Sequence, residues 1–183
     1  AKKYSDITTW LRHRWFVLAH KQNVPTVLDA GALYLAGSLE QPTLITPHSG
    51  ELSALLTARG VPVTAEAIEG DPKKWVCGAA QTLGVTVLLK GSVTYVANDE
   101  LLIELPVATP WLATAGSGDV LAGIIGALVA TNTVEILNDI NRLAHVAATG
   151  AYIHAQAAKN ASRGGPISAE MITAQISGAI SQL

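Results

Sequence analysis

The stretch Ala113-Thr114-Ala115-Gly116-Ser117-Gly118-Asp119-Val120-Leu121-Ala122-Gly123 decides the fold of this chain. Two glycines enclose a serine, an aspartate follows, and an apolar run rich in Ala, Gly, Ile and Leu then begins. A loop that leads into a helix leaves several backbone N–H groups without intrahelical acceptors, and the helix dipole adds partial positive charge at the same end. The stretch therefore predicts an anion site at the N-terminus of a helix.

Asp119 has two possible roles in this stretch. As an N-cap or first-turn acid, it would stabilise the helix that follows. Beside a bound anion, it would act as a general base. The local sequence leaves both roles open.

The composition favours a single folded domain over residues 1–183. Apolar residues make up 49% of the chain and charged residues 14%, which is enough for a sizeable core. The net charge of −2 gives no electrostatic basis for nucleic-acid binding. Residues 1–13 lack the apolar segment of a signal peptide, the apolar run 120–130 is too short to span a bilayer, and the single cysteine, Cys77, cannot form an internal disulfide. We expect a cytoplasmic protein that binds neither nucleic acid nor a membrane.

Short apolar runs alternate with helical patterns along the chain. Strands are expected at residues 25–29, 43–46 and 85–90, and a β-hairpin at 93–97 and 101–105, which turns at 98–99. Helices are expected at residues 6–22, 50–59, 65–83, 118–131, 134–159 and 168–182. This alternation predicts an α/β fold with a mostly parallel central sheet covered by helices on both faces.

Polar motifs follow three of the expected strands. Asp29 follows the first strand, Pro47-His48-Ser49-Gly50-Glu51 follows the second, and Lys90-Gly91 closes the third. Ligands of open α/β sheets bind at the carboxyl ends of the strands, so these motifs are expected to converge on one edge.

Each of these motifs also has a purely structural interpretation. Ser49 would cap the following helix and Glu51 would favour its N-terminus, whereas His48 could instead donate to a substrate. Lys90 could simply leave the sheet edge, or supply positive charge near a phosphate. Asp29 could cap a helical turn, support the residues that contact a ligand, or contact a cation. These alternatives stay open at the level of the residues.

The histidines and Ser117 predict no metal site and no nucleophilic triad. His145 and His154 lie nine residues apart on one expected helix and so on opposite faces, without other ligand-type residues grouped nearby. Ser117 has no histidine nearby in the sequence, and a partner that the fold brings close stays open.

Four phrases together resemble one family: VLDAGAL at 27–33, TPHSGEL at 46–52, LLKGS at 88–92 and ATAGSGDVLAGI at 113–124. The chain is similar to the ADP-dependent NAD(P)H-hydrate dehydratases from about residue 24 onward. This resemblance implies a ribokinase-like three-layer sandwich that uses ADP or ATP with Mg²⁺ to return the hydrates NADHX and NADPHX to NADH and NADPH. AMP and phosphate are the other products with ADP, and the hydrate hydroxyl is transiently phosphorylated. A homo-oligomer is also implied.

The resemblance also implies roles for individual residues. Asp119 would bind the hydrate and act as the catalytic acid/base, and His48 would contact the hydrated nicotinamide. An anion hole for the transferring phosphoryl group would consist of Gly116, Ser117 and Gly118. The adenine-nucleotide site would consist of Lys90, Gly91, Ser92, Val93, Thr94 and Gly118. No residues are expected to form a dedicated metal cage.

The chain departs from the family pattern at Gly31, Tyr34 and Ser49, where the family usually has an acid, an asparagine and a proline. The expected domain also lacks the N-terminal strands with which the family usually begins. Two alternatives follow from these observations: a ribokinase-like kinase of small molecules such as vitamin precursors, and a non-catalytic nucleotide-binding subunit. The TPHSGE phrase favours the dehydratase over the kinase.

Overall fold

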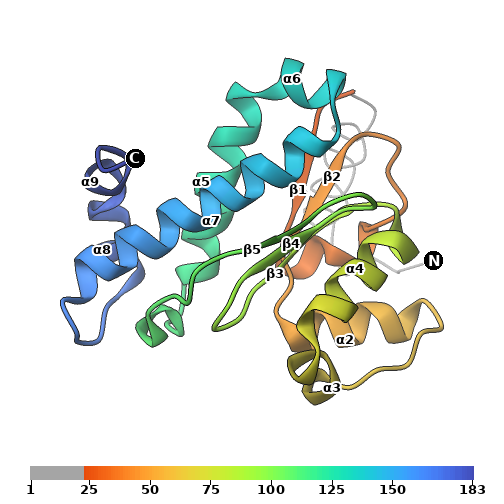
Figure 1. Ribbon diagram of the computed structural model, residues 1–183, viewed down its shortest axis with the longest axis horizontal. Helices are drawn as coiled ribbons and strands as arrows, with labels where there is room; N and C mark the ends of the chain where they lie inside the picture. The colour runs from red at the N-terminus through yellow and green to blue at the C-terminus, as the bar shows by residue number, and fades with distance from the viewer. Residues whose placement is uncertain (1–22) are drawn as a thin grey trace, which may run out of the picture.

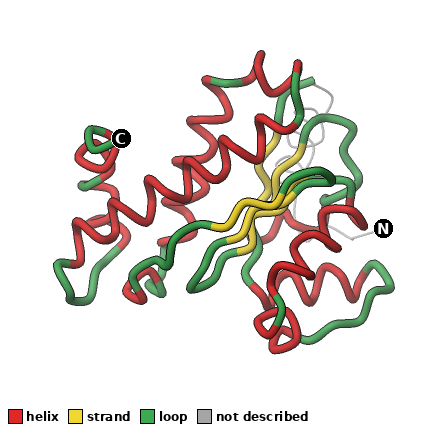
Figure 2. The backbone as a smooth tube through the Cα atoms, viewed as in Figure 1, coloured by secondary structure: helices red, strands yellow, loops and turns green. Residues whose placement is uncertain are grey.

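The computed structural model describes residues 23–183, and the expected helix at 6–22 lies outside them. Within residues 23–183, five strands form one sheet in the order β1 to β5. The strands are β1 (Thr26–Leu28), β2 (Thr43–Ile45), β3 (Thr86–Leu89), β4 (Tyr95–Ala97) and β5 (Leu102–Glu104). Figure 2 shows them between layers of helices.

The prediction of a mostly parallel sheet is wrong, because the sheet is only partly parallel. β1, β2 and β3 pair in parallel, with Leu28 beside Ile45 and Ile45 beside Val87. β3, β4 and β5 pair antiparallel. The reason is connection length: the short links after β3 and β4 allow only hairpin returns, whereas parallel neighbours need a longer crossover.

The two faces of the sheet bury separate apolar clusters, so the fold has three layers. Ile45, Val87 and Leu89 face one cluster. Leu44 and Leu88, the alternate residues of the same strands, face the other. One layer contains the 3-10 helix η1 (Ala30–Leu35), α2 (Ser49–Ala58), α3 (Ala65–Gly70) and α4 (Pro72–Leu83). The opposite layer contains α5 (Ser117–Thr131), α6 (Thr133–Asn138) and α7 (Asn141–Ser162) (Figure 1).

Three of the expected helices are each divided into two helices. The expected helix at 65–83 is divided because Asp71 accepts a hydrogen bond from the Lys74 amide as the N-cap of α4, and Pro72 occupies the first turn. The helix expected at 134–159 is two helices, α6 and α7. The last expected helix divides into α8 (Ala169–Ala174) and α9 (Ile176–Ile180). None of the helices in residues 23–183 has the length and apolar character needed to cross a bilayer.

Candidate active site

The glycine-rich stretch forms the turn before α5, as predicted. Gly116 is the N-cap at φ 81°, and a Cβ at this position would lie 3.1 Å from the Ala169 Cβ, so both conformation and space favour glycine. The N–H of Ser117 donates to the Thr114 carbonyl, and that of Val120 to Gly116. We name residues 114–119 the anion loop. Within the described part of the chain, the N–H groups of Gly118 and Asp119 have no acceptor, which leaves them free for an anion.

Asp119 lies in the first turn of α5 and not at its N-cap. Its side chain is exposed. It makes no hydrogen bond or ion pair with the residues that the structure describes. The N-cap interpretation is therefore wrong, whereas a first-turn acid and a base beside the anion both remain consistent with its position.

Lys90 connects three of the predicted motifs. Its Nζ lies 3.1 Å from Asp29 Oδ1 and 3.6 Å from Glu51 Oε2, and the lysine backbone N–H donates to the Pro47 carbonyl over 2.8 Å. A Cβ built on Gly118 would lie 3.7 Å from the same Nζ. An ammonium beside a helix N-terminus is repelled by the positive end of the helix dipole. The carboxylates of Asp29 and Glu51 offset this repulsion and hold the Lys90 ammonium beside Gly118.

Asp29 contacts a cation and does not cap a helical turn. Its side chain makes no cap hydrogen bond to η1. The Oδ1 atom accepts instead from Thr46 Oγ1 at 2.7 Å and from Lys90 Nζ. The structure therefore excludes the helical cap and shows that Asp29 contacts the Lys90 ammonium.

His48, and not Ser49, caps α2. Its Nδ1 accepts from the amides of Gly50 and Glu51 at 3.1 and 3.3 Å, and the Glu51 carboxylate accepts from the His48 amide at 2.9 Å, which completes a capping box. Ser49 donates instead to Glu69. The His48 side chain is 59% accessible, and its Nε2 lies 3.5 Å from Glu51 Oε2, so a ligand at this edge of the imidazole would meet both groups.

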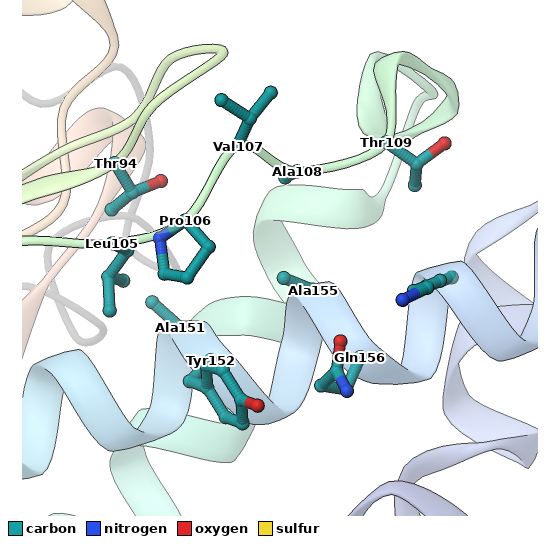
Figure 3. A pocket seen from close by; sticks show the side chains of 11 residues that line it. Thr94, Leu105, Pro106, Val107, Ala108, Thr109, Ala151, Tyr152, Ala155 and Gln156 are labelled. Atoms are coloured by element: carbon teal, nitrogen blue, oxygen red, sulfur yellow. The ribbon is translucent and has the colours of Figure 1, made fainter.

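The expected nucleotide stretch 90–94 is divided between two clefts. Lys90 to Val93 line a cleft of about 380 Å³ that α2, α3 and α4 also border. Thr94 lines a second cleft of about 490 Å³ between the 105–109 segment and α7 (Figure 3).

The second cleft contains residues that the sequence patterns did not indicate. They are Leu105, Pro106, Val107, Ala108, Thr109, Ala151, Tyr152, Ala155, Gln156 and Lys159. Figure 3 shows the 105–109 segment facing the α7 side chains across the opening. Of the residues that line this cleft, the sequence analysis assigned only Thr94 to a nucleotide site. The facing α7 residues lie more than 50 positions away, in a helical pattern that indicates packing and not binding.

Ser117 has a histidine partner that is remote in sequence. Its Oγ lies 3.2 Å from Nε2 of His154 on α7, and both residues are buried. Burial lowers the pKa of His154 to about 4, although a hydrogen bond with the Ser117 backbone opposes the shift. No carboxylate of the described residues hydrogen-bonds to this ring, so the pair does not form a Ser-His-Asp triad.

The His, Cys, Asp and Glu side chains of the described residues decide how a metal ion could bind here. In residues 23–183, no three His, Cys, Asp or Glu side chains form a group that could hold a metal ion. Mg²⁺ commonly keeps several waters and binds through substrate phosphates with one or two carboxylates. The residues present therefore fit a magnesium ion that arrives as part of a nucleotide complex.

The chain resembles curated relatives over part of their length. It is 40% identical over 126 residues to the bifunctional NAD(P)H-hydrate repair enzyme Nnr of Mycobacterium tuberculosis (strain CDC 1551 / Oshkosh), covering 64% of this chain and 24% of the relative. It is 31% identical over 170 residues to the ADP-dependent (S)-NAD(P)H-hydrate dehydratase of Neisseria meningitidis serogroup B, covering 87% and 53%. The chain thus spans from about a quarter to about half of these relatives.

Solved structures share the fold. The ADP/ATP-dependent NAD(P)H-hydrate dehydratase of Bacillus subtilis, co-crystallised with ATP/Mg²⁺, aligns with a TM-score of 0.75 at 22% identity, over 100% of this chain and 61% of the other. The hydroxyethylthiazole kinase of Pyrococcus horikoshii aligns with a TM-score of 0.69 at 19% identity, over 98% and 68%. At these identities the fold alone is shared, and it is common to dehydratases and kinases.

A family model distinguishes between these groups. The model named Carb_kinase and described as NAD(P)H-hydrate dehydratase matches residues 8–181. The match includes all four phrases noted in the sequence. It therefore includes Lys90 and the residues around it, Asp29, Glu51 and Gly118. This chain belongs to the NAD(P)H-hydrate dehydratase family.

Proposed function

We propose that this chain carries out the ADP-dependent dehydration of hydrated NADH or NADPH, a repair reaction that releases AMP and phosphate. One observation carries the proposal. The Lys90 ammonium lies beside Gly118 of the anion loop while pairing with Asp29 and Glu51. The Lys90 ammonium thus connects two parts of the site. The strand ends would hold the hydrate, and the anion loop would hold a phosphoryl group.

The nucleotide would extend from the 490 Å³ cleft to the anion loop. The adenine suits the cleft because Thr94 and the 105–109 segment supply polar and backbone groups beside Ala151 and Ala155 of α7. The β-phosphoryl group suits the free N–H groups of Gly118 and Asp119, with the Lys90 ammonium beside Gly118. Mg²⁺ would enter with the nucleotide and supply charge neutralisation at the phosphates.

Asp119 would start the chemistry as a general base. Its exposed carboxylate takes the proton of the hydrate hydroxyl, whose oxygen then forms a bond to the β-phosphorus of ADP while the bond from that phosphorus to AMP breaks. The phosphorylated carbon next loses inorganic phosphate, and the adjacent carbon loses a proton, so that a carbon–carbon double bond forms. The net result is removal of one water, with ADP hydrolysed to AMP and phosphate.

The deciding experiment follows recovery of NADH from hydrated NADH with ADP and Mg²⁺, by the absorbance of the reduced nicotinamide. Wild-type chain is compared with Asp119→Asn and with Asp99→Asn, a matched change in an exposed turn. We expect Asp119→Asn to lose at least about a hundredfold in turnover with little change in melting temperature, and Asp99→Asn to behave as wild type.

Other outcomes assign other functions. A stable phosphorylated product without release of inorganic phosphate would support the small-molecule kinase. Nucleotide binding that survives Asp119→Ala, without turnover by folded wild-type chain, would support the non-catalytic subunit. A homo-oligomer remains a prediction that light scattering can test.

A further inference from the structure

We propose that His154 is a positioning residue that holds Ser117, and through it the first turn of α5, in the shape that binds a phosphoryl group. The ring of His154 reaches from α7 to a residue 37 positions earlier, with 3.2 Å between Nε2 and Ser117 Oγ. The exposed fractions of His154 and Ser117 are 6% and 5%. The identity of the anion as the β-phosphoryl group of ADP rests on the proposed function.

Apolar residues near Ser117 and His154 in the chain pack α5 against α7. Ile124 of α5 packs with Ile153, Ala157 and Ala158 of α7 in one buried cluster, with Leu112 and Val120 at its border. Replacing a buried hydrogen-bonded pair by apolar groups of similar shape can be nearly neutral for stability. Packing between α5 and α7 therefore does not require a polar contact at this place.

Ser117 is the residue through which such a contact can act on the anion loop. Its N–H is already directed to the Thr114 carbonyl. Its hydroxyl is engaged by His154. Both its backbone and its side chain are therefore held, and the next two N–H groups, of Gly118 and Asp119, are left without acceptors in the described residues.

The buried Ser117 hydroxyl lies against His154 of α7, so in this proposal the hydroxyl acts on the anion loop through position. The ring that holds it contributes no charge. Because burial lowers the pKa of His154 to about 4, the imidazole is neutral at neutral pH. A neutral ring can accept from or donate to the serine without adding to the field at the anion. In this respect His154 differs from Lys90, whose ammonium supplies positive charge beside the anion loop.

The test compares wild type with His154→Leu, His154→Gln and Ser117→Ala, and uses His145→Gln as the control, an exposed histidine on the same helix. Two quantities are measured on each folded chain. One is the ratio of the dissociation constants of AMP and ADP. The other is hydrogen exchange at the Val120 amide, which donates to Gly116 in the first turn of α5.

If His154 positions Ser117, His154→Leu and Ser117→Ala should each weaken ADP binding about five- to tenfold, which is the effect of losing one hydrogen bond. The same variants should weaken AMP binding less than about twofold. Their double variant should lose little more than His154→Leu alone, since both changes remove the contact between Ser117 Oγ and His154 Nε2. His154→Gln, which can still hydrogen-bond, should restore most of the loss. Exchange at Val120 should accelerate in His154→Leu and Ser117→Ala alone.

An unchanged affinity ratio together with unchanged Val120 exchange would overturn the proposal and leave His154 as a core residue. If His154→Leu fails to fold, Ser117→Ala decides, because it removes one oxygen without opening a large cavity. If wild type itself does not prefer ADP to AMP, the proposed function fails at the β-phosphoryl site. The Val120 exchange still decides the role of His154 in that case.

Discussion

Lys90 and Asp29 form an ion pair with 3.1 Å between Nζ and Oδ1, although 61 residues separate them in the chain. Both residues follow parallel strands, β3 and β1, on either side of β2. The carboxyl ends of parallel strands meet at one edge, so the fold brings this acid and this base together. Glu51 completes the arrangement from the start of α2.

Lys90→Met should weaken ADP binding at least about tenfold, because it removes a charge-assisted contact to phosphate from a partly buried site. Titration calorimetry measures the affinity. Lys73→Met is the matched control, since Lys73 forms an exposed ion pair with Glu104 away from the anion loop. An equal loss in both variants would indicate a general effect of net charge and contradict the assignment of Lys90.

His48 variants separate capping from hydrate binding. His48→Ala should lower the free energy of unfolding by about 1 kcal/mol, because Nδ1 caps α2, whereas His48→Asn should keep the cap. Both should weaken binding of the hydrate and leave ADP binding intact. Chemical denaturation and binding titrations measure the two effects. Equal loss of hydrate and ADP affinity would argue against His48 as a hydrate contact.

His154 should make stability depend on pH. Its pKa is about 4 in the folded chain because burial disfavours the charged ring, against 6.5 when unfolded. The unfolded state therefore takes up the proton first, and stability is lost as pH falls from 6.5 toward 4. Between pH 7 and pH 5 we expect a loss of about 2 kcal/mol from this group.

Denaturant unfolding at the two pH values measures this loss. His154→Gln should remove it, and His145→Gln should retain it because His145 is exposed on the same helix. A loss of the same size in His154→Gln and in wild type would assign the pH dependence to other groups.

Gly150→Ala should destabilise the fold by about 1–3 kcal/mol, because a Cβ at this position would lie 2.7 Å from Ile125 Cγ1 where α7 crosses α5. Gly126→Ala on α5 is the control: a Cβ there meets no atom within 4 Å, and alanine favours the helix by up to about 1 kcal/mol. Thermal melts compare the two. A stable Gly150→Ala chain would mean that the two helices are less closely packed than described.

Local patterns in the sequence determined most elements of this protein and the loops that we propose carry its chemistry. Short apolar runs predicted β1, β2 and β3 because strands buried on both faces need apolar residues throughout. The stretch Gly116-Ser117-Gly118-Asp119 predicted the start of α5, because glycine and a first-turn acid are favoured at a helix N-terminus. The convergence of Asp29, His48 and Lys90 on one edge followed from the rule that ligands bind at the carboxyl ends of parallel strands.

Only the tertiary structure decided which side chains meet. His48 took the cap that the pattern assigned to Ser49, since the choice depends on side-chain geometry at the end of β2. The contact between Ser117 and His154, and the cleft between the 105–109 segment and α7, join segments that are remote in the chain. Periodicity reports which face of an element is buried and not which partner it meets, so these contacts leave no local signal.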